Sequence, residues 1–233
     1  MFKIKEREMI KMIEMENVHK SFIQGNNEQK VLNNINLKVD KNDFITIMGP
    51  SGGGKSTLLY TLALLSEPNS GNILFNNKIV NFKNDKEIEK LRRKNIGLIF
   101  QNHNLISCLT ALENIIIAID SKETYKEKKE KAEYFLRKVG LYEKRNVIST
   151  ALSGGEAQRV AVVRALINNP KIIFCDEPTG ALDSANGKKV ISLLLNLKKE
   201  IGCSLVIVTH DEKIGSLGEK RFLLKDGVIN EVV

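Results

Sequence analysis

The residues best suited to chemistry form one run, in which glycines precede a lysine and two hydroxyl side chains: Gly49-Pro50-Ser51-Gly52-Gly53-Gly54-Lys55-Ser56-Thr57. Glycine readily adopts positive φ, so such a run can turn tightly and point successive backbone N–H groups at phosphate oxygens. Lys55 would reach the β- and γ-phosphates, the Ser56 hydroxyl would ligate Mg²⁺, and Thr57 would support the site from the α-phosphate side. The run therefore predicts a binding site for a nucleoside triphosphate.

The segments on either side are those that such a loop requires. Residues 44–48 form a continuous apolar run that predicts a strand buried on both faces, and residues 58–65 predict a mostly buried helix. This order places the positive end of the helix dipole beside the phosphates. The pattern G-x-x-x-x-G-K-[ST] in this context is the P-loop. A glycine-rich turn without a ligand is the alternative, and the full-length match with both correct flanks argues against it.

Two adjacent carboxylates supply the second half of a hydrolysis site. Asp176 ends the apolar run 172–175, and Glu177 follows it directly. A carboxylate at the tip of a buried strand can hold Mg²⁺ through water beside a P-loop, and the next carboxylate can polarise an attacking water as general base. A helix N-cap pair ahead of Pro178 is the alternative interpretation. The P-loop in the same chain favours the catalytic one.

A second phosphate-binding device begins at Ser153. Ser153, Gly154 and Gly155 open a segment that predicts a helix, with apolar residues at 160, 161, 165 and 166. A helix N-terminus with exposed glycines binds anions well, because its N–H groups are free and its dipole end is positive. One nucleotide already has its P-loop. The second device therefore suggests a nucleotide bound to another copy of the chain.

Composition narrows the class of protein. No apolar run approaches the ~20 residues of a membrane-spanning helix, and the N-terminus lacks the apolar region of a secretory signal, so we expect a cytoplasmic chain. The three widely spaced cysteines predict neither disulfides nor a metal motif. The net charge of +8 comes mostly from lysines interleaved with glutamates on helix faces. Because no aromatic residues alternate with basic ones, no nucleic-acid partner is expected.

The order of the predicted elements defines an α/β fold. Apolar strands near residues 45, 97, 172 and 205 alternate with helices, which predicts a P-loop NTPase core with a mostly parallel sheet. Alternating segments within 12–48 and a hairpin at 73–80 predict an antiparallel β subdomain. Residues 102 to about 150 are helical by their periodicity and form an inserted helical subdomain. The expected organisation is a short extension, 1–11, followed by one domain, 12–233.

The motifs in this order resemble those of the ABC-type ATPases. Residues 152–156, Leu-Ser-Gly-Gly-Glu, match the signature sequence of that family and precede Asp176 by the usual short interval. Phe22 stands where the family has an aromatic residue that stacks on adenine, Gln101 matches the glutamine of the Q-loop, and His210 matches the switch histidine that contacts the γ-phosphate. The resemblance covers residues 12–233, nearly the whole chain.

The resemblance implies an ATPase that uses ATP and Mg²⁺ and works as a head-to-tail dimer. Each ATP would lie between the P-loop of one copy and the signature residues of the other. Glu177 would act as general base, while Gln101 and His210 would sense the γ-phosphate. The implied metal-binding residues are Ser56, Gln101 and Asp176, and the implied nucleotide-binding residues beyond the P-loop are Phe22, Ser153, Gly154, Gly155 and Glu156.

The family also implies what the ATPase would drive. The chain would power a membrane transporter from the inner face of the cell membrane, as a peripheral subunit bound to separate integral membrane subunits. Residues 104–114 resemble the segment that docks on such subunits, and with residues 179–184 they look most like the lipoprotein-release and macrolide or antimicrobial-peptide exporter group. The alternatives are a division-associated ATPase with a membrane partner, or an ATPase acting on DNA or the ribosome. No sustained heptads separate the P-loop from the signature, which argues against the chromosome-maintenance type.

Overall fold

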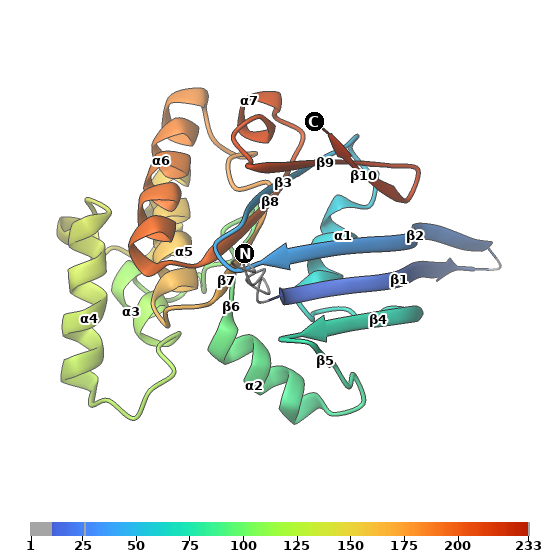
Figure 1. Ribbon diagram of the computed structural model, residues 1–233. Helices are drawn as coiled ribbons and strands as arrows, with labels where there is room; N and C mark the ends of the chain where they lie inside the picture. The colour runs from blue at the N-terminus through green and yellow to red at the C-terminus, as the bar shows by residue number, and fades with distance from the viewer. Residues whose placement is uncertain (1–10, 26, 233) are drawn as a thin grey trace, which may run out of the picture.

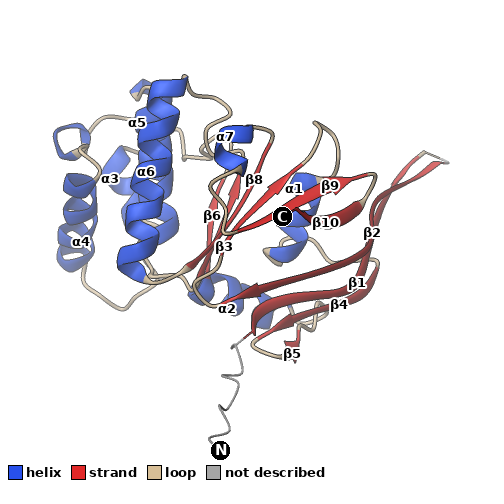
Figure 2. Cartoon of the chain, turned by 45° about the horizontal axis from the view of Figure 1, so that its top comes forward, coloured by secondary structure: helices blue, strands red, loops and turns tan. Residues whose placement is uncertain are grey.

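The computed structural model describes residues 11–25 and 27–232. Two sheets and a layer of helices make up the molecule (Figures 1 and 2). The smaller sheet is antiparallel and contains, in spatial order, β2 (Asn27–Asp40), β1 (Lys11–Gln24), β4 (Ser70–Phe75) and β5 (Lys78–Ile79). The larger sheet contains, in spatial order, β10 (Val228–Val232), β9 (Lys220–Lys225), β3 (Phe44–Met48), β8 (Ser204–Thr209), β7 (Ile172–Asp176) and β6 (Ile96–Ile99).

The larger sheet is parallel except at β10. Strands β9, β3, β8, β7 and β6 run in the same direction, and β10 forms a hairpin with β9 through the predicted turn at Asp226 and Gly227. Every residue of β7 and β8 is buried, as expected for central strands that are covered on both faces. Parallel strands place their carboxyl ends at one edge of the sheet, so residues 48, 176 and 209 end neighbouring strands together.

Helices cover both faces of the larger sheet, and the first of them fills the space between the two sheets. They are α1 (Lys55–Leu62), α2 (Asp85–Asn95), α3 (Ala111–Ile116), α4 (Tyr125–Lys138), α5 (Gly154–Leu166), α6 (Ser184–Ile201) and the short α7 (Glu212–Gly215). One core cluster joins α3–α6 to one face of the larger sheet, and a second joins α1 to the opposite face and to the antiparallel sheet. Helix α1 thus lies between the two sheets and contacts β7 and β8 (Figures 1 and 2).

The predicted α/β architecture, with a mostly parallel sheet, an antiparallel sheet and a helical part, is confirmed. The helix expected over 58–65 is α1, and it ends at Leu62 because Leu64 adopts a left-handed backbone conformation (φ 58°). In the predicted helical region, α3 and α4 both begin with capping boxes, at Thr110 and Thr124. Helix α5 packs against both of them, so this helical layer continues beyond residue 150.

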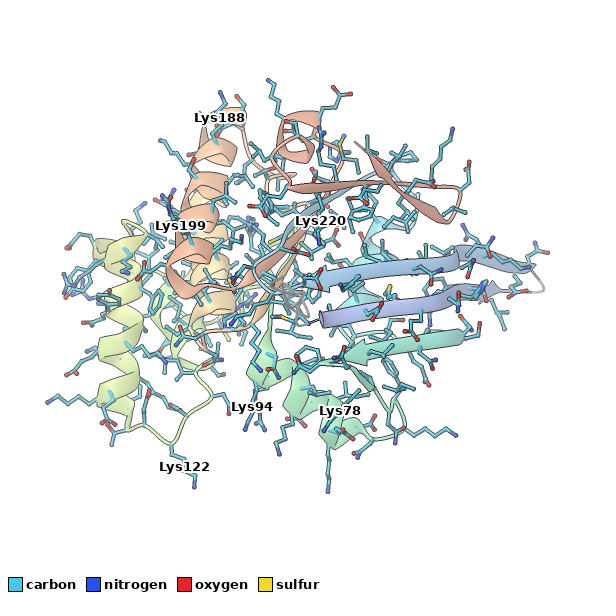
Figure 3. All side chains as sticks on the ribbon, in the orientation of Figure 1. Lys78, Lys94, Lys122, Lys188, Lys199 and Lys220 are labelled. Atoms are coloured by element: carbon cyan, nitrogen blue, oxygen red, sulfur yellow. The ribbon has the colours of Figure 1, made fainter. Side chains whose placement is uncertain are left out.

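The predicted N-terminal extension falls almost wholly outside the described residues, and Lys11 already begins β1. No helix within 11–25 and 27–232 is long and apolar enough to cross a membrane. The six lysines labelled in Figure 3 come from β5, α2, the loop before α4, α6 and β9, so they are spread over the molecule. Lys220 is paired with Asp43 at 2.7 Å, so part of the positive charge is neutralised locally.

Candidate functional site

The P-loop connects β3 to α1 and turns through two glycines with positive φ. Gly52 has φ 75°, and Gly54 has φ 88° and is the N-cap of α1. Gly49 is required for a different reason: a Cβ there would lie 2.3 Å from the carbonyl oxygen of Leu224 in β9. The Lys55 ammonium donates to the carbonyl oxygens of Gly49 and Pro50, both at 3.0 Å, from a buried side chain. The loop therefore surrounds a lysine at a helix N-terminus, which is an anion-binding geometry.

The structure brings Ser56 and Asp176 together, as predicted. The Ser56 hydroxyl donates to Asp176 Oδ1 at 3.0 Å, across 120 residues of sequence. Asp176 is 6% exposed at the end of β7. A hydroxyl and a carboxylate oxygen are donors of the type that Mg²⁺ prefers, and its remaining positions are usually filled by water and nucleotide phosphates. The donor set at the P-loop therefore fits Mg²⁺.

Tyr60 belongs to this cluster, although the sequence interpretation treats it only as part of a buried helix. Its hydroxyl donates to Asp176 Oδ2 at 2.7 Å. Burial, reinforced by the neighbouring Asp176 carboxylate, raises the pKa of Tyr60 well above its ordinary value, so the hydroxyl stays protonated and remains a donor. The signal available in the sequence was spacing: Tyr60 lies four residues after Ser56, hence on the same face of α1.

Glu177 spans the ends of β7 and β8 beside the P-loop lysine. Its Oε1 lies 2.9 Å from His210 Nδ1 and 3.8 Å from Lys55 Nζ, and its Oε2 accepts from the Thr209 hydroxyl at 3.2 Å. The backbone of Glu177 is in the left-handed region (φ 46°), and its N–H donates to the carbonyl of Val208. A carboxylate held beside a phosphate-binding lysine is well placed to accept a proton from water. Sequence reasoning predicted both Glu177 and His210 but not their direct contact.

Gln101 follows β6 and lies against the segment after Glu177. A Cβ on Gly180 would lie 2.8 Å from Gln101 Nε2, so this glycine makes room for the glutamine side chain. The next residues are held by α5: Arg164 donates to the backbone carbonyls of His103, at 2.7 Å, and Asn104. The loop that carries Gln101 is thus tied to the signature helix.

Phe22 lies near the end of β1, in the antiparallel sheet. Its side chain is 46% exposed, and Lys20 Nζ lies 5.3 Å from the ring centroid. Phe22 pairs with Gln29 of β2, and Val31, two residues along that strand, contacts the P-loop: a Cβ on Gly54 would lie 2.8 Å from Val31 Cγ1. The antiparallel sheet therefore brings an exposed aromatic ring to the neighbourhood of the phosphate site.

The signature residues form the start of α5, as predicted. Ser153 is the N-cap, and Gly154 begins the helix; both are exposed. Gly155 is buried, so only one of the two glycines is exposed as expected. Glu156 folds back to accept from the Ser153 N–H at 2.9 Å, and it pairs with Lys144. These two contacts, with Lys144 the larger cause, lower the pKa of Glu156 to about 2. Glu156 thus fixes the helix start, which leaves the N-terminus of α5 facing solvent as a second anion-binding position.

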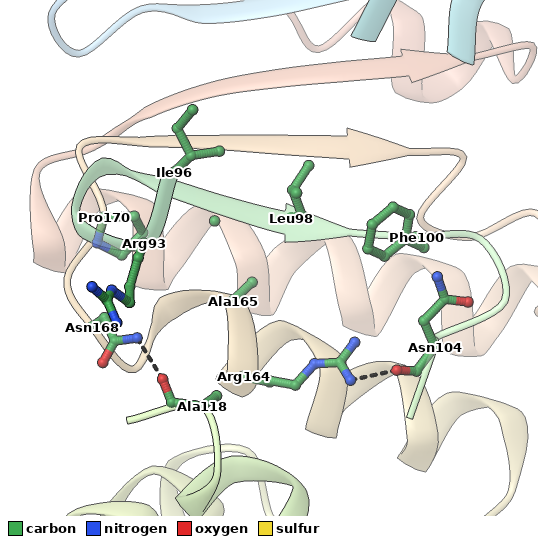
Figure 4. Close-up of a pocket in the computed structure, with 11 residues that line it drawn as sticks. Arg93, Ile96, Leu98, Phe100, Asn104, Ala118, Arg164, Ala165, Asn168 and Pro170 are labelled. Carbon is green, nitrogen blue, oxygen red and sulfur yellow. Dashed lines mark hydrogen bonds between the residues drawn. The ribbon is translucent and has the colours of Figure 1, made fainter. Parts of the chain in front are cut away.

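A pocket of about 420 Å³ lies along the edge strand β6 (Figure 4). It is bounded by Arg93 of α2 and Arg164 of α5, with Asn104 at one end and Asn168 at the other. Asn168 donates to the carbonyl of Ala118 at 2.7 Å, which closes the wall on the side of the helical layer. The pocket lies beside the loop that carries Gln101 rather than at the P-loop.

A family model and individual known proteins place this chain among the same relatives. The family model described as "ABC transporter" matches residues 32–180. The lipoprotein-releasing system ATP-binding protein LolD of Aquifex aeolicus is 44% identical over 96% of this chain and 99% of its own length. The macrolide export ATP-binding/permease protein MacB of Bdellovibrio bacteriovorus is 42% identical over 94% of this chain, which spans 33% of that longer protein.

Solved structures agree with the fold. An ATP-binding cassette of Methanocaldococcus jannaschii, solved as a dimer in a post-hydrolysis state bound to ADP and Pi, superposes with a TM-score of 0.88. It is 40% identical to this chain and the match covers 95% of this chain and 98% of that one. A second dimeric structure of the same cassette, described as a bacterial ABC transporter cassette, also has a TM-score of 0.88, at 41% identity.

Proposed function

The chain belongs to the ABC transporter family of ATP-binding proteins, and from this premise we propose that it binds and hydrolyses ATP to drive a membrane transporter. The observation that carries the proposal is the cluster at the strand ends, where Lys55, Ser56, Asp176 and Glu177 converge. A phosphate-binding lysine, a metal-binding pair and a carboxylate base are the groups that hydrolysis of a triphosphate needs. The two P-loop residues lie more than 100 residues before the two carboxylates in the sequence, and the fold brings the four side chains together.

Each predicted site residue has a role in this proposal. The P-loop backbone from Gly49 to Gly54 and the Lys55 ammonium bind the phosphates, and Phe22 stacks on adenine. Ser56, Gln101 and Asp176 hold Mg²⁺, which neutralises charge on the β- and γ-phosphate oxygens when it is bound.

The Glu177 carboxylate accepts the proton of the attacking water. His210, whose ring contacts Glu177 Oε1, senses the γ-phosphate beside that carboxylate. A nucleotide phosphate that engages Lys55 replaces the contacts that the ammonium makes with Gly49 and Pro50.

Two copies close head to tail around two ATP molecules in this proposal. The N-terminus of α5, where Ser153 and Gly154 are exposed and Gly155 is buried, supplies the N–H groups that bind the γ-phosphate of the nucleotide on the partner copy. Glu156 supports the site by fixing the start of the helix, and its contact with Lys144 keeps that start in place. ATP binding therefore favours the closed dimer, and hydrolysis removes the bridging phosphate and reopens it.

The membrane partner docks on the helical layer. The segment 104–114 and the pocket along β6 lie on this side, and two arginines, Arg93 and Arg164, bound the pocket (Figure 4). The relatives named for lipoprotein release and macrolide export support an exporter-type partner of the peptide, lipoprotein or drug class. The chain would act from the cytoplasmic face of the membrane.

Capture of the partner tests this function. Tagged Glu177→Gln chain, expressed in its native host and loaded with Mg-ATP, is purified from detergent-solubilised membranes, and the bound proteins are identified by mass spectrometry. A stoichiometric polytopic membrane protein with an exporter's extracytoplasmic domains is the expected result. Recovery of a division-associated membrane protein would replace transport with that function, and recovery of only ribosomal or DNA-associated proteins would overturn the membrane role. The Lys55→Ala chain, which should not bind ATP, is the matched control. A protein that is captured by both chains does not need the bound nucleotide.

A further inference from the structure

Among the described residues, 11–25 and 27–232, two side chains donate to the Asp176 carboxylate, Ser56 and Tyr60, and the family's motifs account only for Ser56. We propose that Tyr60 is a positioning residue for the metal site: its hydroxyl fixes Asp176 Oδ2, so that Oδ1 stays directed at Ser56 and the bound Mg²⁺. The inference rests on the proposed ATPase function, because it assigns a role within that site. Tyr60 itself touches neither the nucleotide nor the metal in this proposal.

The geometry holds both oxygens of one carboxylate from two adjacent turns of α1. Ser56 and Tyr60 are four residues apart, hence on one face of the helix, and that face meets the end of β7. Ser56 Oγ donates to Oδ1 at 3.0 Å and Tyr60 Oη donates to Oδ2 at 2.7 Å. With one donor on each oxygen, rotation of the carboxylate about its Cβ–Cγ bond would break both bonds. The carboxylate is thereby held in a single orientation.

Burial makes this arrangement difficult to replace. Asp176 is 6% exposed, so a lost tyrosine hydroxyl leaves Oδ2 with restricted access to water. The carboxylate would then be free to rotate, and the Ser56 hydroxyl, which already donates to Oδ1, is a donor that the free oxygen could reach. Rotation toward Ser56 would compete with the metal for both groups at once. Outer partners of metal-binding carboxylates act in this way in general, since they orient the group that binds the metal.

The ring of Tyr60 links the metal site to the strand that leads into Gln101. Its centroid lies 6.1 Å from that of Phe100 at an interplanar angle of 56°, which is within the range of favourable aromatic pairs. Phe100 directly precedes Gln101. The Phe100 contact fixes the ring, and the ring fixes the position of the hydroxyl. Tyr60→Phe therefore removes the hydrogen bond while it keeps the packing against Phe100.

The test compares metal binding in Tyr60→Phe and in a matched tyrosine variant. Tyr125→Phe makes the same chemical change at a side chain that is 66% exposed at the start of α4. All chains carry Glu177→Gln so that ATP persists, and Mn²⁺ replaces Mg²⁺ so that bound metal is counted by electron paramagnetic resonance, with protein in excess of ATP. Polarisation of a fluorescent ATP analogue in EDTA measures nucleotide binding without metal. Circular dichroism and the melting temperature confirm that each variant is folded.

We expect Tyr60→Phe to weaken Mn²⁺ binding to the ATP-loaded chain by about 10-fold, at the lower end of the ~10- to 100-fold typical for loss of a partner behind a metal ligand. Tyr125→Phe should bind Mn²⁺ as the parent does, and nucleotide affinity in EDTA should be unchanged in both. Equal Mn²⁺ affinity in Tyr60→Phe and the parent would overturn the proposal. An equal loss of nucleotide affinity with and without metal would also overturn it, because it would indicate a purely structural role.

The parent chain provides the separate check on the proposed function. Binding of ATP with no added binding of Mn²⁺ in the parent would refute the metal site itself, and the role of Tyr60 with it. Metal binding in the parent together with no effect of Tyr60→Phe would refute only the role of Tyr60. The two failures are therefore distinguishable in one series of titrations.

Discussion

Replacing Glu177 by glutamine should slow hydrolysis strongly and leave ATP binding intact. The carboxylate makes its contacts through both oxygens, to His210, Thr209 and Lys55. Glutamine has the same shape and keeps one oxygen that can accept from Thr209 or from the histidine ring. It loses the negative charge that makes Glu177 a base.

The size of the effect follows from the role of the group. A positioned general base contributes about 10²- to 10⁴-fold to a rate, so the single-turnover rate should fall by that factor. Binding should change in the opposite direction. Glu177 Oε1 lies 3.8 Å from Lys55 Nζ, with side chains that are 12% and 8% exposed, so its charge partly neutralises the phosphate-binding lysine. The neutral amide leaves more of the lysine charge for phosphate, and the Kd for ATP should therefore be equal to that of the wild-type chain or lower.

Two assays measure these changes. Phosphate release in a single turnover with protein in excess gives the rate, and polarisation of a fluorescent ATP analogue gives the Kd. Glu212→Gln is the matched control, because it makes the same carboxylate-to-amide change on the exposed start of α7. A rate within ten-fold of the wild-type rate would refute the assignment of Glu177 as base. A large loss of ATP affinity would refute the reasoning about Lys55.

Three further predictions follow from individual contacts. Lys55→Ala should abolish binding of ATP, because it removes the ammonium that binds the phosphates and that the Gly49 and Pro50 carbonyl oxygens hold in place; full ATPase activity in this variant would refute the site. Gly180→Ala should leave the melting temperature nearly unchanged but reduce hydrolysis, since the new Cβ would lie 2.8 Å from Nε2 of the Gln101 side chain and displace that side chain rather than backbone; unchanged turnover would show that the position of Gln101 does not matter. Glu156 has a folded-state pKa of about 2, below its ordinary 4.5, so its contribution to stability is complete above pH 4.5 and is lost as the pH falls toward 2. Glu156→Gln should therefore be less stable than the wild-type chain at pH 7 and about equally stable at pH 2. Chemical denaturation at the two pH values measures the free energy of unfolding. An equal difference in stability at both pH values would contradict the charge-based explanation.

Local sequence patterns were sufficient for most of the fold and for the outline of the site. The strand before the P-loop, the buried strand ending at Asp176 and the turn at Gly227 are encoded by short runs of apolar residues and glycines. Their order also indicated the family, which the match over residues 32–180 confirms. These features depend on neighbours in sequence, which is why a single sequence carries them.

The remaining features depend on contacts between distant segments. The end of α1 at Leu62 depends on a left-handed Leu64, and leucine has no intrinsic preference for that conformation. The contact of Glu177 with His210 exists because β7 and β8 are neighbours in the sheet, and strand order cannot be read from either strand alone. The hydrogen bond of Tyr60 to Asp176 crosses 116 residues. No local pattern distinguishes this tyrosine from an ordinary residue of a buried helix.

In the proposed dimer, ATP joins two copies of the chain through the P-loop of one and the helix start at Gly154 of the other. The most direct measurement is the mass of the Glu177→Gln chain by size exclusion with light scattering, with and without Mg-ATP. A second chain adds Gly154→Glu, which puts a negative charge where the partner's γ-phosphate would bind, at a helix start that tolerates acidic residues. We predict that ATP raises the mass of Glu177→Gln to twice the 26.2 kDa of one chain, and that the double variant binds ATP but stays monomeric. A monomeric Glu177→Gln chain with ATP bound, or a double variant that dimerises equally well, would contradict the claim.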